Sequence, residues 1–178
     1  MIHPQSMLSL ISNGDQRLMR RVNRWRPPRW VRIWMILATR GGDGGLWYAM
    51  AIAVLVWGGP QRFRAVMATG IAVLTGIALF RVLKRLAHRD RPCTSFSHCW
   101  ATLLPPDKFS FPSGHSITAF AVAMSLSSFY PGLLAGLIFL ATSVALSRVM
   151  LGLHYLSDVV VGCGLGASLG YAAFLLLR

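Results

Sequence analysis

The chain has 178 residues, of which 54% are hydrophobic and 13% charged, and its formal net charge is +13. Soluble domains carry about 25% charged residues, so this composition argues against an ordinary soluble domain and favours a polytopic membrane protein. It also argues against a nucleic-acid binder, because the basic residues stand between apolar runs and do not form one soluble basic face. The length suffices for one domain, and we take residues 1–178 as a single membrane-embedded unit.

Residues 1–40 are predicted to form an interfacial segment that does not cross the membrane. Residues 1–15 are weakly patterned and suggest a loose tail or a short surface helix. Residues 17–24 predict an amphipathic helix that lies among lipid headgroups and ends at Pro27 and Pro28. One face of this helix carries four arginines: Arg17, Arg20, Arg21 and Arg24. Residues 30–39 are apolar but too short to cross a bilayer, so we expect them to be partly embedded.

Five apolar stretches follow, and each is predicted to be a membrane-spanning helix. They cover residues 46–57, 65–83, 113–130, 133–146 and 155–177. The first is short for a span of ~20 residues, and we expect Asp43 to cap it. The stretches lack the alternation of a membrane barrel, so the fold class is all-α: a polytopic membrane helix bundle with about five to six transmembrane helices. Four glycines predict a small-residue packing face on the last helix: Gly162, Gly164, Gly166 and Gly170.

The order of these spans brings three polar clusters to one face of the membrane. The second span ends at Lys84, so the third must begin on the same side. The chain leaves the membrane near Pro131 and returns at Ser147, and the last span starts at His154. Residues 84–91, 112–115 and 147–158 are therefore expected to lie together.

The three clusters read Lys-x6-Arg-Pro, Pro-Ser-Gly-His and Ser-Arg-x5-His-x3-Asp. In this order and spacing they resemble the three-part signature of the type 2 phosphatidic acid phosphatase (PAP2) superfamily. The resemblance covers residues 84–158, and no element of the signature is missing. Each motif alone is weak, but the three together on one face are specific.

The resemblance implies a role for each residue that its chemistry allows. His154 would attack phosphorus and form a phosphohistidine, while Asp158 would hold the other ring nitrogen and stabilise the developing positive charge. His115 would protonate the departing oxygen and then activate water. Five residues would bind the phosphate through cationic side chains or through a helix N-terminus: Lys84, Arg91, Ser113, Gly114 and Arg148. With only five acidic residues in the chain, we expect no metal and no cofactor.

Other charged residues near these motifs match no catalytic position. Arg85 and Arg89 are interpreted as ordinary headgroup-facing charges, and His88, His98 and Asp90 receive no role. Asp43 is expected on the catalytic face and could orient an arginine there, although helix capping is the preferred interpretation. Cys93 and Cys99 could form a disulfide if their loop faces an oxidising compartment.

The resemblance implies a metal-independent lipid phosphatase of the bacterial inner membrane. Its partners would be a lipid phosphate substrate and membrane lipids, with no nucleic acid. Candidate substrates are phosphatidylglycerophosphate, phosphatidic acid, undecaprenyl diphosphate and lipid A 1-phosphate, and the loop over residues 92–112 would select among them. The alternatives are a lipid phosphotransferase with the same intermediate, a non-catalytic module that binds anionic lipid through the N-terminal arginines, and a transporter, which the absence of inverted repeats disfavours.

The side of the membrane that the site faces is open to two opposing arguments. The resemblance implies the outer, periplasmic face. Eight arginines between Arg17 and Arg40 lie on the side of the site, whereas the other side carries Arg62, Arg64 and Arg178. By the positive-inside rule, this distribution favours the cytoplasmic face, unless a longer helix over residues 30–39 crosses the membrane.

Overall fold

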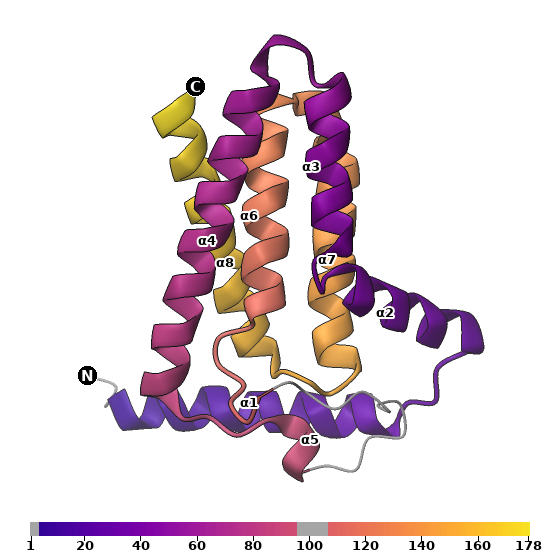
Figure 1. The fold of residues 1–178 in the computed structure, drawn as a ribbon. Helices are drawn as coiled ribbons and strands as arrows, with labels where there is room; N and C mark the ends of the chain where they lie inside the picture. Colours follow the sequence, from indigo (N-terminus) through magenta and orange to yellow (C-terminus); the bar gives the residue numbers. More distant parts are fainter. Residues whose placement is uncertain (1–3, 96–106) are drawn as a thin grey trace.

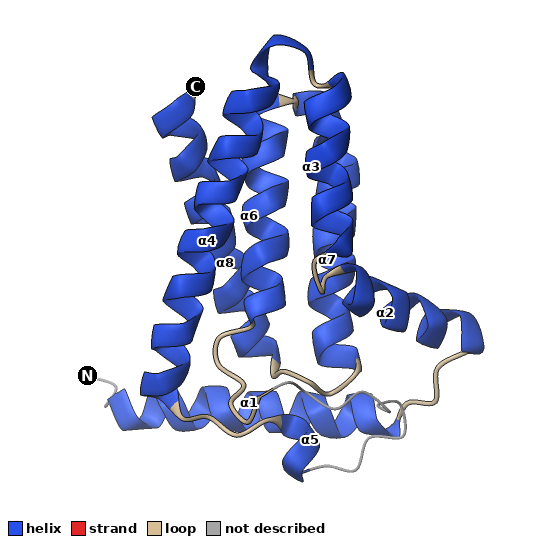
Figure 2. Ribbon diagram, viewed as in Figure 1, coloured by secondary structure: helices blue, strands red, loops and turns tan. Residues whose placement is uncertain are grey.

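The computed structural model describes residues 4–95 and 107–178, and over these residues it contains helices and turns but no strand (Figure 2). The main body is a bundle of five helices (Figure 1). These are α3 (Gly45–Trp57), α4 (Arg62–Ala87), α6 (Gly114–Phe129), α7 (Leu134–Met150) and α8 (Leu156–Leu177). Short turns join α3 to α4 through η1 (Gly59–Gln61) and α6 to α7 through η2 (Pro131–Leu133).

The helices agree with the predicted all-α membrane bundle. Among the described residues, three segments are long and apolar enough to cross a bilayer: Gly59–Ala87, Pro131–Met150 and Leu156–Leu177. The helix over Gly45–Trp57 is apolar but shorter, as its sequence predicts. Large apolar side chains on the outside of the bundle, such as Leu74 and Leu176, are more than 60% exposed, which suits a surface that contacts lipid tails.

Helix α6 lies at the centre of the bundle and packs most closely against α8. A Cβ atom added to Gly162, Gly166 or Gly170 would stand 2.8, 2.2 or 2.5 Å from a backbone carbonyl oxygen of α6 or of the residue before it. These three glycines therefore let the two helix backbones touch. Gly164 was predicted on the same face, but no atom lies within 4 Å of its added Cβ, because it points away from α6.

The N-terminal residues form one continuous helix, α1 (Pro4–Arg24), so of the two interpretations of residues 1–15, a loose tail or a short surface helix, the helix agrees with the structure over the described residues. It runs across one end of the bundle (Figure 1). Asp15, Met19 and Val22 are buried along one stripe, at the spacing of one helix face. The four predicted surface arginines, Arg17, Arg20, Arg21 and Arg24, are exposed.

Helix α2 (Arg29–Gly41) follows at the same end and extends to the side of the bundle (Figure 1). With 13 residues it is too short to cross a bilayer, in line with the sequence. Val31 and Met35 are buried in one cluster with Leu151 and Leu153, at the end of α7. Helix α2 and the α7–α8 turn therefore lie at the same end of the bundle.

Candidate active site

The three signature segments meet in a cavity of about 210 Å³ at the end of the bundle where α1 lies. Six of the eight predicted site residues line it: Lys84, Arg91, Gly114, His115, Arg148 and His154. Asp158 and Ser113 are fully buried and are not among its lining residues. The cavity is completed by five residues outside the predicted set: Gly42, Asp43, Phe80, Asp107 and Thr118.

The turn from α7 to α8 fixes the position of His154. Helix α7 ends when Leu151 N–H donates to the Ser147 carbonyl, and Gly152 then adopts a left-handed φ of 69° that favours glycine. The N–H groups of Leu153 and His154 both donate to the carbonyl oxygen of Arg148, at 2.9 and 3.0 Å. The backbone of one phosphate-binding candidate thus anchors the candidate nucleophile.

The hydrogen-bond partners of His154 define its tautomer. Its Nε2 lies 3.1 Å from Nη1 of Arg91, and a guanidinium can only donate, so Nε2 accepts. The ring proton is then on Nδ1, which faces Oδ2 of Asp158 at 3.6 Å. This distance is too long for a hydrogen bond, and Nδ1 has no other partner among the described residues. The unprotonated nitrogen is the one beside Arg91.

Burial lowers the pKa of His154 to about 3. The Asp158 carboxylate opposes this shift, and the positive charges of Arg148 and Arg91 reinforce it. Desolvation disfavours the charged imidazolium, so the ring is neutral at ordinary pH. A neutral ring is the form that can act as a nucleophile.

Two of the three cations already hold an anion, the Asp107 carboxylate. Arg91 is 2% exposed and donates from Nη2 to Asp107 Oδ1 at 2.7 Å and from Nε to the Asp107 carbonyl at 2.9 Å. Lys84 pairs with the other carboxylate oxygen. Burial raises the pKa of Asp107, but the hydrogen bonds from Lys84 and Arg91 outweigh it, so the net shift is downward. Lys84 and Arg91 thus converge on a single oxyanion group.

The pairing of two loop ends brings Asp107 to this position. Asp90 and Phe109 form an antiparallel bridge, and Ser110 N–H donates to the Arg89 carbonyl at 2.7 Å.

The third cation, Arg148, donates to Thr39 of α2 and keeps its Nε without a partner among the described residues. The Arg148 side chain lines the cavity, and phosphate binding by it stays a prediction.

His115 forms a pair that the sequence did not predict. Its Nε2 lies 2.7 Å from Oδ1 of Asp43, and a carboxylate accepts, so Nε2 carries the proton. Asp43 was expected to cap α3, but the N-cap of that helix is Gly44 and no side chain caps it. Asp43 reaches the catalytic face as predicted, and there it contacts a histidine, not an arginine.

Ser113 and Gly114 open helix α6. Ser113 is its N-cap, and its Oγ accepts from Ser116 N–H at 3.4 Å and from Ser116 Oγ at 2.9 Å. The Ser113 N–H donates to the Asp158 carbonyl at 3.1 Å, which ties the second motif to the third. Gly114 lines the cavity directly. Phosphate binding by this helix start remains a prediction.

Arg89 differs from its interpretation as a headgroup-facing charge. It is partly buried and donates to Asp158 and Asp15, each at 2.7 Å. The sequence offers no signal for this, because Asp15 lies far away along the chain. Arg85 is exposed, as expected, and so is His88. His98 and Cys99 lie outside the described residues, so the possible Cys93–Cys99 disulfide also lies outside them.

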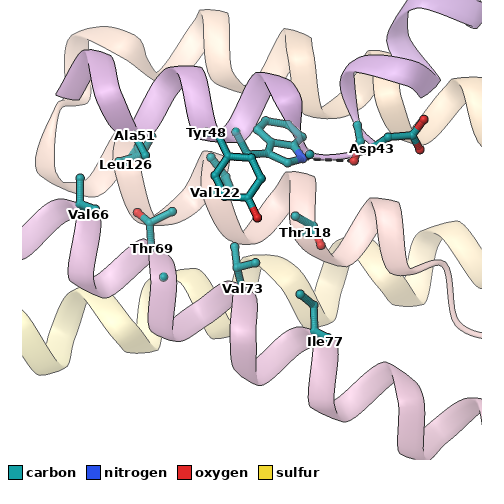
Figure 3. Close-up of a pocket in the computed structure, with 14 residues that line it drawn as sticks. Asp43, Tyr48, Ala51, Val66, Thr69, Val73, Ile77, Thr118, Val122 and Leu126 are labelled. Atoms are coloured by element: carbon teal, nitrogen blue, oxygen red, sulfur yellow. Dashed lines mark hydrogen bonds between the residues drawn. The ribbon is translucent and has the colours of Figure 1, made fainter. Parts of the chain in front are cut away.

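An apolar groove of about 340 Å³ continues from the catalytic cavity between α3, α4 and α6 (Figure 3). Gly42, Asp43 and Thr118 line both spaces. Figure 3 shows Asp43 at one end of the groove, with Tyr48 along its length. The remaining lining residues are mostly aliphatic: Ala51, Val66, Val73, Ile77, Val122 and Leu126. The groove therefore connects a polar cavity with an apolar path along the bundle.

Comparisons with known proteins agree with this architecture. The chain is 34% identical over 140 residues to the decaprenylphosphoryl-5-phosphoribose phosphatase of Mycobacterium tuberculosis, covering 77% of this chain and 67% of that protein. It is 32% identical over 115 residues to the lipid A 1-phosphatase of Rhizobium johnstonii, covering 62% and 44%. It is 39% identical over 101 residues to phosphatidylglycerophosphatase B of Bacillus subtilis, covering 49% and 46%.

Two crystal structures share the fold. The transmembrane PAP2-type phosphatidylglycerolphosphate phosphatase of Bacillus subtilis matches with a TM-score of 0.70 at 26% identity, over 92% of this chain and 84% of that one. Aquifex aeolicus LpxE matches with a TM-score of 0.74 at 26% identity, over 89% and 93%. A family model described as the PAP2 superfamily matches residues 65–178. The chain belongs to the PAP2 superfamily and is a membrane lipid phosphatase.

Proposed function

We propose that the enzyme removes a phosphate from a lipid phosphomonoester or diphosphate through a phosphohistidine on His154, without a metal. One observation carries the proposal: Nε2 of a buried, neutral His154 lies 3.1 Å from Arg91, and Arg91 and Lys84 jointly bind a carboxylate. A phosphate held by these cations would have phosphorus next to the unprotonated nitrogen. Proximity of this kind accounts for a large part of phosphoryl-transfer catalysis.

In the first step, His154 Nε2 forms a bond to phosphorus and the bond to the lipid oxygen breaks. Lys84, Arg91 and Arg148 stabilise the charge on the remaining phosphate oxygens. Helix α6 begins at Gly114, on the cavity wall, and its free N–H groups add further donors. The positive charge that develops on the ring is stabilised by Asp158.

The leaving oxygen needs a proton, and His115 would supply it as an imidazolium, which leaves its ring neutral for the second step. Its Nε2 proton is directed at Asp43 in the free enzyme, and a substrate oxygen in the cavity would compete for it. In the second step the deprotonated His115 takes a proton from water, the water oxygen bonds to phosphorus, and the His154–phosphorus bond breaks. Asp43 orients His115 before the substrate binds, and its negative charge stabilises the imidazolium that donates the proton.

The substrate is proposed to be an amphiphile whose tail occupies the groove between α3, α4 and α6. The groove joins the cavity at Gly42, Asp43 and Thr118, so a phosphate in the cavity and a tail in the groove can belong to one molecule. The relatives are named for three substrates: decaprenylphosphoryl-5-phosphoribose, lipid A 1-phosphate and phosphatidylglycerophosphate. They share a phosphate attached to a lipid-anchored group, and this is the class that we propose here.

Phosphate release from a panel of lipid phosphates, measured with and without EDTA, tests the proposal. The panel should contain the three substrates above, phosphatidic acid and undecaprenyl diphosphate. We expect release in EDTA, loss of activity in His154→Ala, and an acid-labile phosphoenzyme that His154→Ala does not form. His3→Ala is the control, because His3 is a histidine that belongs to none of the three signature segments. Activity of His154→Ala at the wild-type level would refute the mechanism, and inactivation by EDTA would refute metal independence.

A further inference from the structure

A group of buried and partly buried polar residues connects helix α1 to the carboxylate behind His154. It consists of Asp15, Arg89, Ser157 and Asp158, and three of the four have no part in the mechanism above. Asp158 is 0% exposed and Asp15 is 6% exposed. Buried charges of this kind are costly unless they are paired, so each contact among them matters.

Arg89 is held on several sides. Its Nη1 donates to Asp158 Oδ1 and to Ser157 Oγ, each at 2.7 Å, and its Nη2 donates to Asp15 Oδ2 at 2.7 Å. Its Cζ lies 4.1 Å from the centre of the Tyr155 ring, a cation–π geometry. The guanidinium therefore bridges two carboxylates that lie 143 positions apart in the sequence.

Asp15 binds the start of α8 as a helix cap supplied by another helix. Its Oδ1 accepts from the Ser157 N–H at 3.1 Å, and its Oδ2 accepts from the Ser157 hydroxyl. This N–H is one of those that an α-helix leaves without a partner in its first turn. Met19, one turn further along α1, is buried in a cluster with Val149, Tyr155 and Val159. Helix α1 is thus fixed to the helix that carries Asp158.

These contacts orient the Asp158 carboxylate. Its Oδ2 accepts from the Tyr155 N–H at 2.9 Å while Oδ1 is bound by Arg89, so neither oxygen is free to rotate away from His154. Arg89 by itself would cancel the negative charge of Asp158. Asp15 offsets that positive charge, and the three charged groups together carry a net charge of −1. A net negative charge stabilises the ring when it becomes positive on phosphorylation.

We infer that Arg89 and Asp15 are positioning residues for the reaction, and that docking of α1 on the bundle sets the orientation and charge of Asp158. The inference rests on the proposed function, because it takes His154 as the nucleophile. Helix α1, which was predicted to lie at the membrane surface, would then contribute to the geometry of the site. Detaching α1 would expose Ser157 and remove Asp15 from Arg89, so that Arg89 would pair with Asp158 alone.

Steady-state kinetics of the full chain in nanodiscs test this inference with matched pairs of variants. We expect Arg89→Gln and Asp15→Asn to lower kcat about 10- to 100-fold, the loss typical for removing a residue that orients an active-site group, with little change in KM. The controls are Arg85→Gln and Asp90→Asn, which remove exposed charges of the same type close by in the sequence. Both controls should retain the wild-type kcat.

A double-mutant cycle separates positioning from a general structural role. If Arg89 acts through Asp158, then Arg89→Gln added to Asp158→Asn should cost less than about threefold, since neighbours in one network are not additive. The full loss in that background would overturn the inference, and so would a higher KM at constant kcat. If Arg89→Gln does not fold, Arg89→Lys and Asp15→Asn carry the same test. Wild-type activity in His154→Ala would instead refute the proposed function, whatever Arg89 does.

Discussion

Replacing Gly166 by alanine should separate the two helices that align the second and third motifs. The added Cβ would lie 2.2 Å from the Ile117 carbonyl oxygen and 3.0 Å from the Ala121 nitrogen. Ordinary contacts of this kind are about 3.5 Å or longer, so the α6 and α8 backbones must move apart by roughly 1 Å. Both contacting atoms belong to a helix backbone, and no rotamer change can relieve the clash.

The expected cost is about 1–3 kcal/mol in the free energy of unfolding, the range for overpacking a close interface. Alanine is also a better helix former than glycine by up to about 1 kcal/mol, which would partly hide this cost. Gly164→Ala corrects for this gain, because it makes the same change in the same helix with no atom within 4 Å. The difference between the two variants therefore measures the clash.

Unfolding of both variants in mixed micelles, followed by circular dichroism, gives this difference. We also expect Gly166→Ala to lose activity, because a shift of α8 disturbs the 3.1 Å bond from Ser113 N–H to the Asp158 carbonyl. Gly164→Ala should keep its activity. Equal stabilities of the two variants would show that α6 and α8 are not packed at Gly166 and would refute the reasoning.

Three further predictions concern the site. Asp43→Asn should lower kcat for a lipid phosphate about 10- to 100-fold, because Asp43 acts through the general acid His115. The loss should be smaller for a p-nitrophenyl phosphate ester, whose leaving group needs no proton. Equal losses on both substrates would argue against a role of Asp43 in assisting His115. His154 should be neutral with its proton on Nδ1 at pH 5 in nitrogen NMR, and a charged ring at that pH would contradict its lowered pKa. Because the unfolded chain binds this proton at the ordinary pKa of 6.5, the free energy of unfolding should fall as the pH drops from 6.5 towards 3, and His154→Gln should lack that part of the slope. The third prediction concerns the side of the membrane that the site faces. In a variant with all three cysteines replaced by serine, Arg85→Cys should react with an impermeant maleimide added outside the cell, and Arg64→Cys, at the other end of α4, should not. The reverse labelling pattern would show that the arginines of α1 and α2 set the orientation.

The sequence predicted the bundle and most of the cavity because both follow from local patterns. Apolar runs give the spans, and their order alone brings Lys84, His115 and His154 to one end. The motif spacing then identifies the groups that line the cavity. Gly164 was misassigned because every second residue from 162 to 166 is a glycine, and only the rotation of α8 decides which of them face α6.

The residues that the sequence did not reveal are those paired over long distances. Asp15 contacts Ser157, which lies 142 positions away, and Asp43 contacts His115 across 72 positions. Arg89 follows the turn at His88, which ends α4 in a left-handed conformation with a φ of 45°, uncommon for any residue other than glycine. No periodicity encodes such a turn, so Arg89 looked like one more basic residue at a helix end.

The carbonyl of Arg148 has a consequence for how the enzyme admits a lipid. Its side chain lines the cavity, and its backbone oxygen holds the N–H groups of Leu153 and His154. The proposed phosphate-binding group and the proposed nucleophile are therefore held by one short turn. A lipid phosphate that enters the cavity would therefore meet Arg148 and His154 at a separation that the turn itself sets.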